Sequence, residues 1–179
     1  QGAGHIGGRA ADRRAFQDDH LANIKQRTLK ILGIINDLQM KAIFQNGIAL
    51  YTLERELIEA YKSVGVKHLV LAVESGCERV LKEIIHKPLD LAIVKRVADD
   101  CRELDIYTDV NLLIGFPGET KQEIDEAARF LRTINANWFR VVVATPLVGS
   151  EMFEICQRKG YLPHGYLDAN YKKAVVDTE

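Results

Sequence analysis

Short apolar runs alternate with segments of helical periodicity along most of this chain, and this alternation restricts the fold more than any other feature. Runs typical of strands lie at 42–45, 68–73, 107–114 and 139–144, and a shorter strand is expected to end at Asp18. Several are rich in Val, Leu and Ile without strict alternation, as in sheets with both faces covered. They begin at intervals of about thirty residues, which suits strand-helix-strand crossovers. We predict an α/β domain with a parallel sheet, either curled into a barrel or open and doubly wound.

Apolar stripes of helical spacing separate these runs. One helix is expected to begin at Thr52 and to end at Gly65, where a left-handed residue commonly closes a helix. Another follows Thr120 and Glu123, which have the spacing of a capping box. Two more helices are expected between the runs at 68–73 and 107–114, separated by a break at Pro88. Proline inside a helix removes a hydrogen bond and clashes with the preceding turn.

The two ends of the chain differ in composition from its middle. Residues 1–15 are rich in glycine and arginine, with Ile6 as the one large aliphatic side chain. We predict a flexible leader at 1–15, a core domain at 16–160 and a C-terminal extension at 161–179.

Charge and hydropathy argue against several classes of function. The 24 basic and 25 acidic residues give a formal net charge of −1, without a long run of either sign. There is therefore no electrostatic case for a nucleic-acid or membrane surface. No apolar stretch approaches the roughly 20 residues of a spanning helix, and the N-terminus does not resemble a secretory signal. Together with three irregularly placed cysteines, these features predict a cytoplasmic protein.

Polar residues follow several expected strands, at the edge where α/β sheets bind ligands. These segments are Asp18-Asp19-His20, Asn46-Gly47, Glu74-Ser75-Gly76 and residues 111–119. Glu74 emerges directly from a buried run, so its carboxylate must be paired or used. Gly115 and Gly118 permit close backbone approach, and the helix that follows is expected to point free N–H groups at the rim. An ordinary strand-to-helix turn, with Asn111 bonded to backbone, remains the simpler alternative.

The three cysteines lack the spacing of a metal motif. Cys101 and Cys156 fall on apolar stripes and are expected to pack in the core. Cys77 is expected nearer the rim, but no histidine is placed to activate it as a nucleophile.

Three motifs, taken in order, resemble a known family. They are Glu74-Ser75-Gly76-Cys77-Glu78-Arg79-Val80-Leu81-Lys82, Leu113-Ile114-Gly115-Phe116-Pro117-Gly118-Glu119-Thr120 and Thr145-Pro146-Leu147-Val148-Gly149-Ser150. Together they are similar to the later two thirds of a radical S-adenosylmethionine (radical SAM) core, most of all in the subgroup that often carries an upstream cobalamin-binding domain. The Asp-Asp strand end and the Asn-Gly turn also match this subgroup. The resemblance extends from Phe16 to Leu162.

The resemblance implies a partial (β/α)6 TIM-like barrel that binds S-adenosylmethionine at its open rim. A [4Fe–4S] cluster would donate an electron that cleaves this cofactor into methionine and a 5′-deoxyadenosyl radical. The residues that the resemblance assigns to the cofactor are Asp18 and Asp19 near the methionine amino group, Glu74 with Ser75 and Lys87 at the ribose or methionine end, Asn111 at the ribose, and Leu113 with Gly115 beside the adenine. The stretch between Glu74 and Lys87 is one residue longer than is usual in the family.

The cluster-binding loop of that family is missing from this sequence. The family holds its cluster with a Cys-x-x-x-Cys-x-x-Cys loop after the first strand, and the chain has neither the loop nor the strand. We therefore expect a truncated domain, inactive in isolation, whose parent enzyme supplies the loop in a missing N-terminal part. A reducing electron donor is implied as a partner, and the substrate cannot be identified from the sequence.

Other interpretations use the same residues. Asp18-Asp19-His20 and Glu74 would suit a divalent ion in a metal-dependent (β/α) barrel hydrolase or isomerase. A chain that has lost its cofactor would instead be a non-catalytic scaffold domain. A Schiff-base aldolase is disfavoured, because Lys41 and Lys67 lie at the entry ends of their strands.

Overall fold

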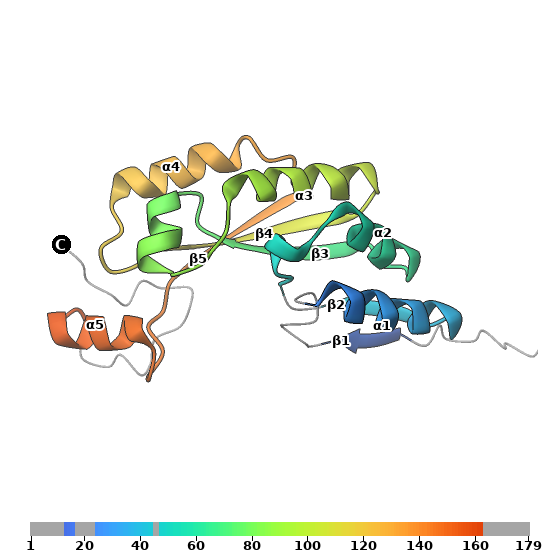
Figure 1. Cartoon of the computed structure of the whole chain (residues 1–179). Helices are drawn as coiled ribbons and strands as arrows, with labels where there is room; N and C mark the ends of the chain where they lie inside the picture. Colours follow the sequence, from blue (N-terminus) through green and yellow to red (C-terminus); the bar gives the residue numbers. More distant parts are fainter. Residues whose placement is uncertain (1–12, 17–23, 45–46, 163–179) are drawn as a thin grey trace, which may run out of the picture.

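The computed structural model describes residues 13–16, 24–44 and 47–162 of the chain (Figure 1). Strands and helices alternate through most of these residues. In chain order they are β1 (Arg13–Phe16), α1 (Lys25–Asp37), β2 (Lys41–Phe44), the 3-10 turn η2 (Leu50–Thr52), α2 (Arg55–Ser63), β3 (His68–Glu74), the π-helical turn η3 (Val80–Ile84), α3 (Leu91–Glu103), β4 (Tyr107–Ile114), α4 (Lys121–Leu131), β5 (Trp138–Val143) and α5 (Glu151–Lys159).

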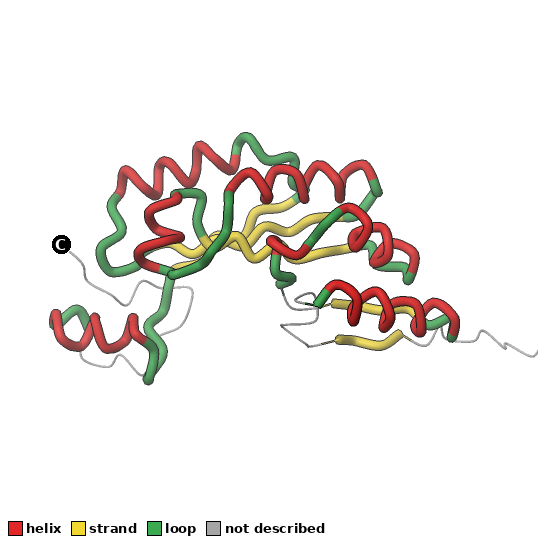
Figure 2. Tube along the Cα trace, in the orientation of Figure 1, coloured by secondary structure: helices red, strands yellow, loops and turns green. Residues whose placement is uncertain are grey.

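All strand pairs among the described residues are parallel. β1 pairs with β2, and β3, β4 and β5 form a three-stranded sheet in sequential order. A single bridge between Ile48 and Leu71 connects the segment after β2 to the larger sheet. Figures 1 and 2 show α3 and α4 side by side along one side of that sheet, whereas α5 lies apart from them. The predicted α/β class with a partial barrel is confirmed.

The helix-facing side of the larger sheet forms the centre of the core. Leu69, Leu71 and Val73 of β3 are fully buried, and they cluster with Val110 of β4 and Val97 of α3. Their burial supplies the main stabilisation, because each apolar side chain removed from water contributes about 1.5–3 kcal/mol. Since side chains alternate along a strand, Asp109, Asn111 and Leu113 occupy the opposite, inner face of β4.

Helix boundaries agree with the expected signals at three of four places, including Gly65, whose left-handed φ of 79° follows the end of α2. Thr120 and Glu123 form both hydrogen bonds of a capping box at the start of α4. The chain also breaks around Pro88, between η3 and α3. The expectation for Thr52 is wrong: its hydroxyl donates to the carbonyl of Ala49 at 2.7 Å, inside η2, and α2 begins three residues later. Thr52 therefore stabilises the preceding turn.

The N-terminal part differs from expectation. β1 begins at Arg13, within the range predicted to be a leader, and ends before Asp18. Helix α1 carries no capping side chain at Ile24, and Ile34 on its surface is exposed, so the usual start signal and a clean apolar stripe are both missing. Among the described residues, no helix combines the length and hydropathy needed to cross a bilayer.

Truncating β3 should reveal how strongly the fold depends on this core. Leu71 is 0% exposed, so Leu71→Ala should lower the free energy of unfolding by about 2–5 kcal/mol, measured by urea denaturation. Leu147, at 69% exposed, provides the matched control, and Leu147→Ala should change stability by less than about 0.5 kcal/mol. Equal effects of the two substitutions would contradict the assigned core.

Candidate functional site

The end of β3 is irregular at Glu74. Its φ is 72°, a left-handed conformation that is uncommon outside glycine, and the register with β4 shifts between Ala72 and Glu74. Such backbone conformations cost energy and recur at functional sites, where surrounding structure holds them in place. The strand thus ends in a constrained turn that fixes the direction of the chain at Ser75, which is buried.

Lys87 returns to the end of β3 and holds Glu74. Its Nζ donates to the Ala72 carbonyl at 2.5 Å and lies 3.4 Å from Glu74 Oε1. Both side chains are about four fifths buried, with exposed fractions of 21% and 22%. The structure therefore brings together two residues that the resemblance assigns to one ligand.

The connection between Glu74 and Lys87 passes through the π-helical turn η3. The Ile85 N–H donates to the carbonyl of Val80, five residues earlier, at 2.9 Å. The Lys87 N–H donates to the Leu81 carbonyl at 2.8 Å. A π-helical turn holds one residue more than an α-helical turn. It would therefore accommodate the additional residue that the resemblance implies between Glu74 and Lys87.

Asn111 occupies the inner face of β4, between β3 and β5. It pairs with Ala72 on one side and with Arg140 on the other. Its Oδ1 is buried and has no hydrogen-bond partner among the described residues. A buried acceptor without a donor is costly. This oxygen is therefore a candidate acceptor for a donor outside the described residues.

Asp109 lies on the same face two residues earlier. Arg140 Nη2 donates to its Oδ2, whereas its buried Oδ1 has no partner among the described residues. Asp109 and Asn111 thus both lie on the inner face of β4, and Leu113 follows them on that face towards the rim.

The turn after β4 is held from within by Glu119. Its Oε2 accepts hydrogen bonds from the N–H groups of Gly115 at 2.6 Å and Phe116 at 3.2 Å. Burial raises the pKa of Glu119, and these two N–H groups oppose that rise. These two N–H groups are therefore not free to bind a ligand. A ligand beside Gly115 would have to use carbonyl groups and apolar contact.

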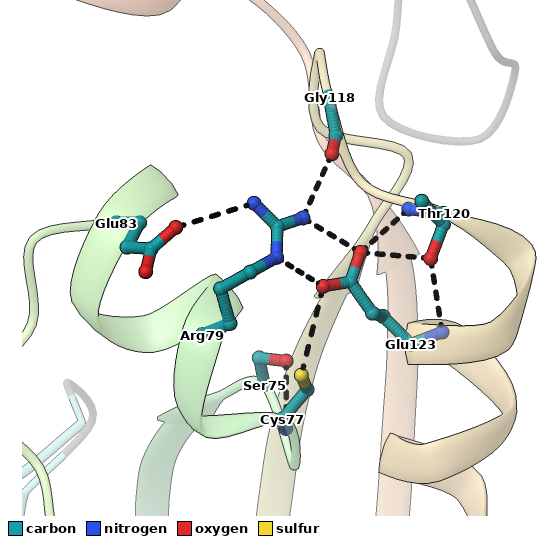
Figure 3. Close-up of polar contacts among 7 residues, drawn as sticks. All are labelled: Ser75, Cys77, Arg79, Glu83, Gly118, Thr120 and Glu123. Atoms are coloured by element: carbon teal, nitrogen blue, oxygen red, sulfur yellow. Dashed lines mark hydrogen bonds and ion pairs between the residues drawn. The ribbon is translucent and has the colours of Figure 1, made fainter.

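A second carboxylate, Glu123, joins the turn to the segment after β3 (Figure 3). Arg79 donates to both oxygens of Glu123, and its Nη2 also donates to the Gly118 carbonyl at 2.9 Å. Glu123 further accepts from the N–H of Thr120 at 2.8 Å. Arg79 is the main reason that the pKa of Glu123 is lowered to about 2. No local sequence signal indicates a role for Arg79, because its partners lie about 40 residues away.

Gly76 allows the same segment to lie directly against α4. A Cβ at this position would be 2.8 Å from Ala127 Cα and 2.9 Å from Phe130 Cδ1. Such contacts are too short for any larger residue unless the backbone moves. The turn after β3 is therefore closely packed as well as hydrogen-bonded.

The cysteines do not form a ligand set. All three are buried, and Cys77 lies close to the rim, with its Sγ 3.9 Å from Glu123 Oε1. Burial raises the pKa of Cys101 to about 12, so its thiol stays protonated. No group of three potential metal ligands occurs within the residues that the structure describes. A [4Fe–4S] cluster therefore does not fit this part of the chain.

Some expected site residues lie outside the described part. These are Asp18, Asp19, His20 and Asn46. The contacts that the resemblance assigns to them, and the metal site of the hydrolase alternative, remain predictions from the sequence.

Comparisons with known proteins identify related sequences and folds. The sequence profile of the Radical SAM superfamily matches residues 6–131. The chain is 25% identical over 170 residues to cytidylyl-2-hydroxyethylphosphonate methyltransferase of Streptomyces wedmorensis, covering 90% of this chain and 32% of that protein. It is 34% identical over 89 residues to tRNA-2-methylthio-N(6)-dimethylallyladenosine synthase of Desulfotalea psychrophila, covering 46% of this chain and 19% of that protein.

The fold is similar to that of solved structures. The radical S-adenosylmethionine methyltransferase TsrM from Kitasatospora setae, with cobalamin and a [4Fe–4S] cluster bound, gives a TM-score of 0.68 at 15% identity, covering 83% of this chain and 31% of that chain. Coproporphyrinogen III oxidase (HemN) from Escherichia coli gives a TM-score of 0.55 at 13% identity, covering 69% of this chain and 29% of that chain. The chain thus spans about a third of the methyltransferases that it matches over most of its length.

Close packing at Gly76 can be tested with a matched pair of substitutions. Gly76→Ala should lower the free energy of unfolding by about 1–3 kcal/mol, because the new methyl group collides with the backbone of α4. Gly33 in α1 has open space around it, so Gly33→Ala should stabilise the chain by about 0.5–1 kcal/mol. If Gly76→Ala leaves the free energy of unfolding unchanged in urea denaturation, the turn and α4 are not in contact.

The link between Arg79 and Glu123 predicts a specific pH dependence. The folded-state pKa of Glu123 lies below its unfolded value of 4.5, so its stabilisation is complete above that value and is lost as the pH falls towards about 2. At pH 7, Glu123→Gln should lower the free energy of unfolding by about 1–2 kcal/mol, and this difference should shrink below pH 4.5. Glu126→Gln, at an exposed position of the same helix, is the control. A difference that does not vary with pH would rule out this ionic link.

Proposed function

This chain belongs to the radical SAM superfamily, and from this membership we propose that it forms the cofactor-binding part of a longer radical SAM enzyme. Enzymes of this family use S-adenosylmethionine and a [4Fe–4S] cluster. The observation that carries the proposal is the buried Asn111 Oδ1 on the inner face of β4, which has no donor within the part of the chain that the structure describes. The adjacent strand β3 ends at the paired Glu74 and Lys87.

The residues at this rim fit S-adenosylmethionine in their chemistry. Asn111 Oδ1 would accept a hydrogen bond from a ribose hydroxyl, and the Glu74 carboxylate would accept from a hydroxyl or from the methionine ammonium. Lys87 fixes Glu74 and adds a positive charge that suits the methionine carboxylate. Leu113 and Gly115 would provide apolar contact and backbone carbonyl groups for the adenine.

Ser75 contributes through structure at the same turn. Its hydroxyl accepts a hydrogen bond from the Cys77 N–H at 3.2 Å and is buried. We propose that it holds the turn after Glu74 in shape. Asp18 and Asp19 stay assigned to the methionine amino group by the resemblance.

When bound, S-adenosylmethionine supplies the 5′-deoxyadenosyl radical on reductive cleavage, the activity that we propose for the parent enzyme. The three cysteines are buried and scattered, so we assign the cluster ligands to a part of that enzyme beyond the printed sequence. The electron donor would act on that other part. This chain's own contribution is to bind and orient the cofactor.

We further propose methyl transfer as the reaction class of the parent. The relative matched over 90% of this chain and the structure matched over 83% are both named as methyltransferases. TsrM holds cobalamin in its structure, which supports a cobalamin-binding domain as the missing partner. The division into a core at 16–160 and an extension at 161–179 belongs to the same proposal.

Ligand-observed NMR with S-adenosylmethionine tests the proposal on the 179-residue chain. We expect weak binding, with a dissociation constant of about 1 mM, or about −4 kcal/mol, because the cluster that anchors the methionine end is absent. Asn111→Leu should abolish the saturation-transfer signal without unfolding the chain, because it removes the ribose acceptor. Asn36→Leu, at an exposed position of α1, should leave the signal intact. Wild-type chain without a signal, or an unaffected Asn111→Leu variant, would refute the assignment.

A further inference from the structure

The two ends of the proposed cofactor site come from different strand-helix units. Glu74 ends β3 and Lys87 follows that strand, whereas Leu113 lies near the end of β4 and Gly115 follows it. A ligand that spans them requires a fixed spacing between the two turns. Hydrogen bonds within the sheet end where the strands end, so this spacing depends on contacts beyond the sheet.

Arg79 provides those contacts. It lies five residues after Glu74 and extends across to the other turn, where it binds the Gly118 carbonyl at 2.9 Å and Glu123 Oε2 at 2.7 Å (Figure 3). Its Nη1 is also 3.5 Å from Glu83 on its own side. One guanidinium group thus joins the backbone of the second turn to the start of the segment after β3.

The segment that carries Arg79 cannot move independently of Glu74. Gly76 is packed against Ala127 of α4, and Ser75 is buried with its hydroxyl bonded to the Cys77 N–H. This packing does not involve the guanidinium group, so it is a separate observation. A displacement at Arg79 would therefore be transmitted to the strand end.

We propose that Arg79 is a positioning residue that sets the spacing between the Glu74–Lys87 pair and the turn at Gly115. The clamp formed by Arg79, Glu123 and the Gly118 carbonyl would determine affinity for a nucleoside ligand that spans both turns, without contacting that ligand. This inference rests on the proposed function. Arg79 is 41% exposed, so its removal leaves the apolar core intact.

Arg55 offers a matched control for the test. It forms an ion-pair network of similar size with Glu59, Asp100 and Glu103, at 40% exposure. These partners lie on α2 and α3, and none of them belongs to the two turns. Arg55→Ala removes comparable charge interactions without altering the spacing at the rim.

The experiment compares Arg79→Ala, Arg79→Lys and Arg55→Ala in the full chain. Affinity for S-adenosylmethionine is measured by ligand-observed NMR, and stability is measured by urea denaturation. The exchange rates of the amide hydrogens in Gly115–Thr120 are measured without ligand. Arg79→Ala should weaken binding at least about tenfold, the scale at which groups that orient a ligand-binding residue act. It should also accelerate exchange in the turn. Arg79→Lys should be intermediate, because an ammonium group cannot bind both partners as a planar fork does. Arg55→Ala should leave affinity unchanged.

The outcomes separate this inference from the proposed function. Unchanged affinity in Arg79→Ala, with faster exchange in the turn, would overturn the inference and leave the cofactor site in place. A stability loss far greater than that of Arg55→Ala, with affinity falling in parallel, would assign Arg79 a general structural role and overturn the inference as well. Absence of binding by the wild-type chain would refute the proposed function, and the inference with it.

Discussion

The register between β3 and β4 is the constraint on which the arrangement of the rim depends. The helix-facing side chains Leu69, Leu71 and Val110 are fully buried, and a shift by one residue would turn them to the other face. This burial fixes the pairing of Ala72 with Asn111. Both strands are parallel, so the turns that follow them meet at one edge. Polar groups at the rim are therefore positioned by apolar side chains on the opposite face.

Charge at this edge is compensated largely within the chain. Glu119 is bonded to the N–H groups of its own turn, and Glu123 is bonded to Arg79 and Thr120. Among the described residues, the buried acceptors left without a donor at this edge include single oxygens of Asp109 and Asn111 on the inner face and of Glu119 in the turn. A site with unpaired acceptors favours a ligand that brings donors. The hydroxyl groups of a ribose meet that requirement.

Local signals allowed much of the fold to be predicted from the sequence. The capping box at Thr120, the break at Pro88 and the apolar runs of β3 and β4 each depend on residues close together in the chain. Thr52 was assigned wrongly, since a hydroxyl that can cap a helix can equally bond back to the preceding turn. Helix α1 was not recognised because it lacks a capping side chain. Local sequence patterns cannot distinguish a hydroxyl that caps a helix from one that bonds to the preceding turn, because tertiary contacts decide between them.

The candidate site was predictable only in part. The resemblance assigned Glu74 and Lys87 to one ligand, and their side chains lie 3.4 Å apart in the structure, whereas their role in binding a cofactor is a proposal. The contact between Arg79 and Glu123 joins residues 44 apart and has no local signature. Glu119 could have been anticipated, because a glutamate four residues after Gly115 is within reach of the turn's own N–H groups.

Chemical-shift mapping of the labelled chain during titration with S-adenosylmethionine tests the central claim most directly. The account predicts that the perturbed amides cluster at the ends of two adjacent strands, around Glu74 and Ser75 and from Asn111 to Gly115. Lys87 should respond with them, and α1 and α5 should not. Perturbations elsewhere on the chain, or none at saturating ligand, would contradict the claim that this edge of the sheet binds the cofactor.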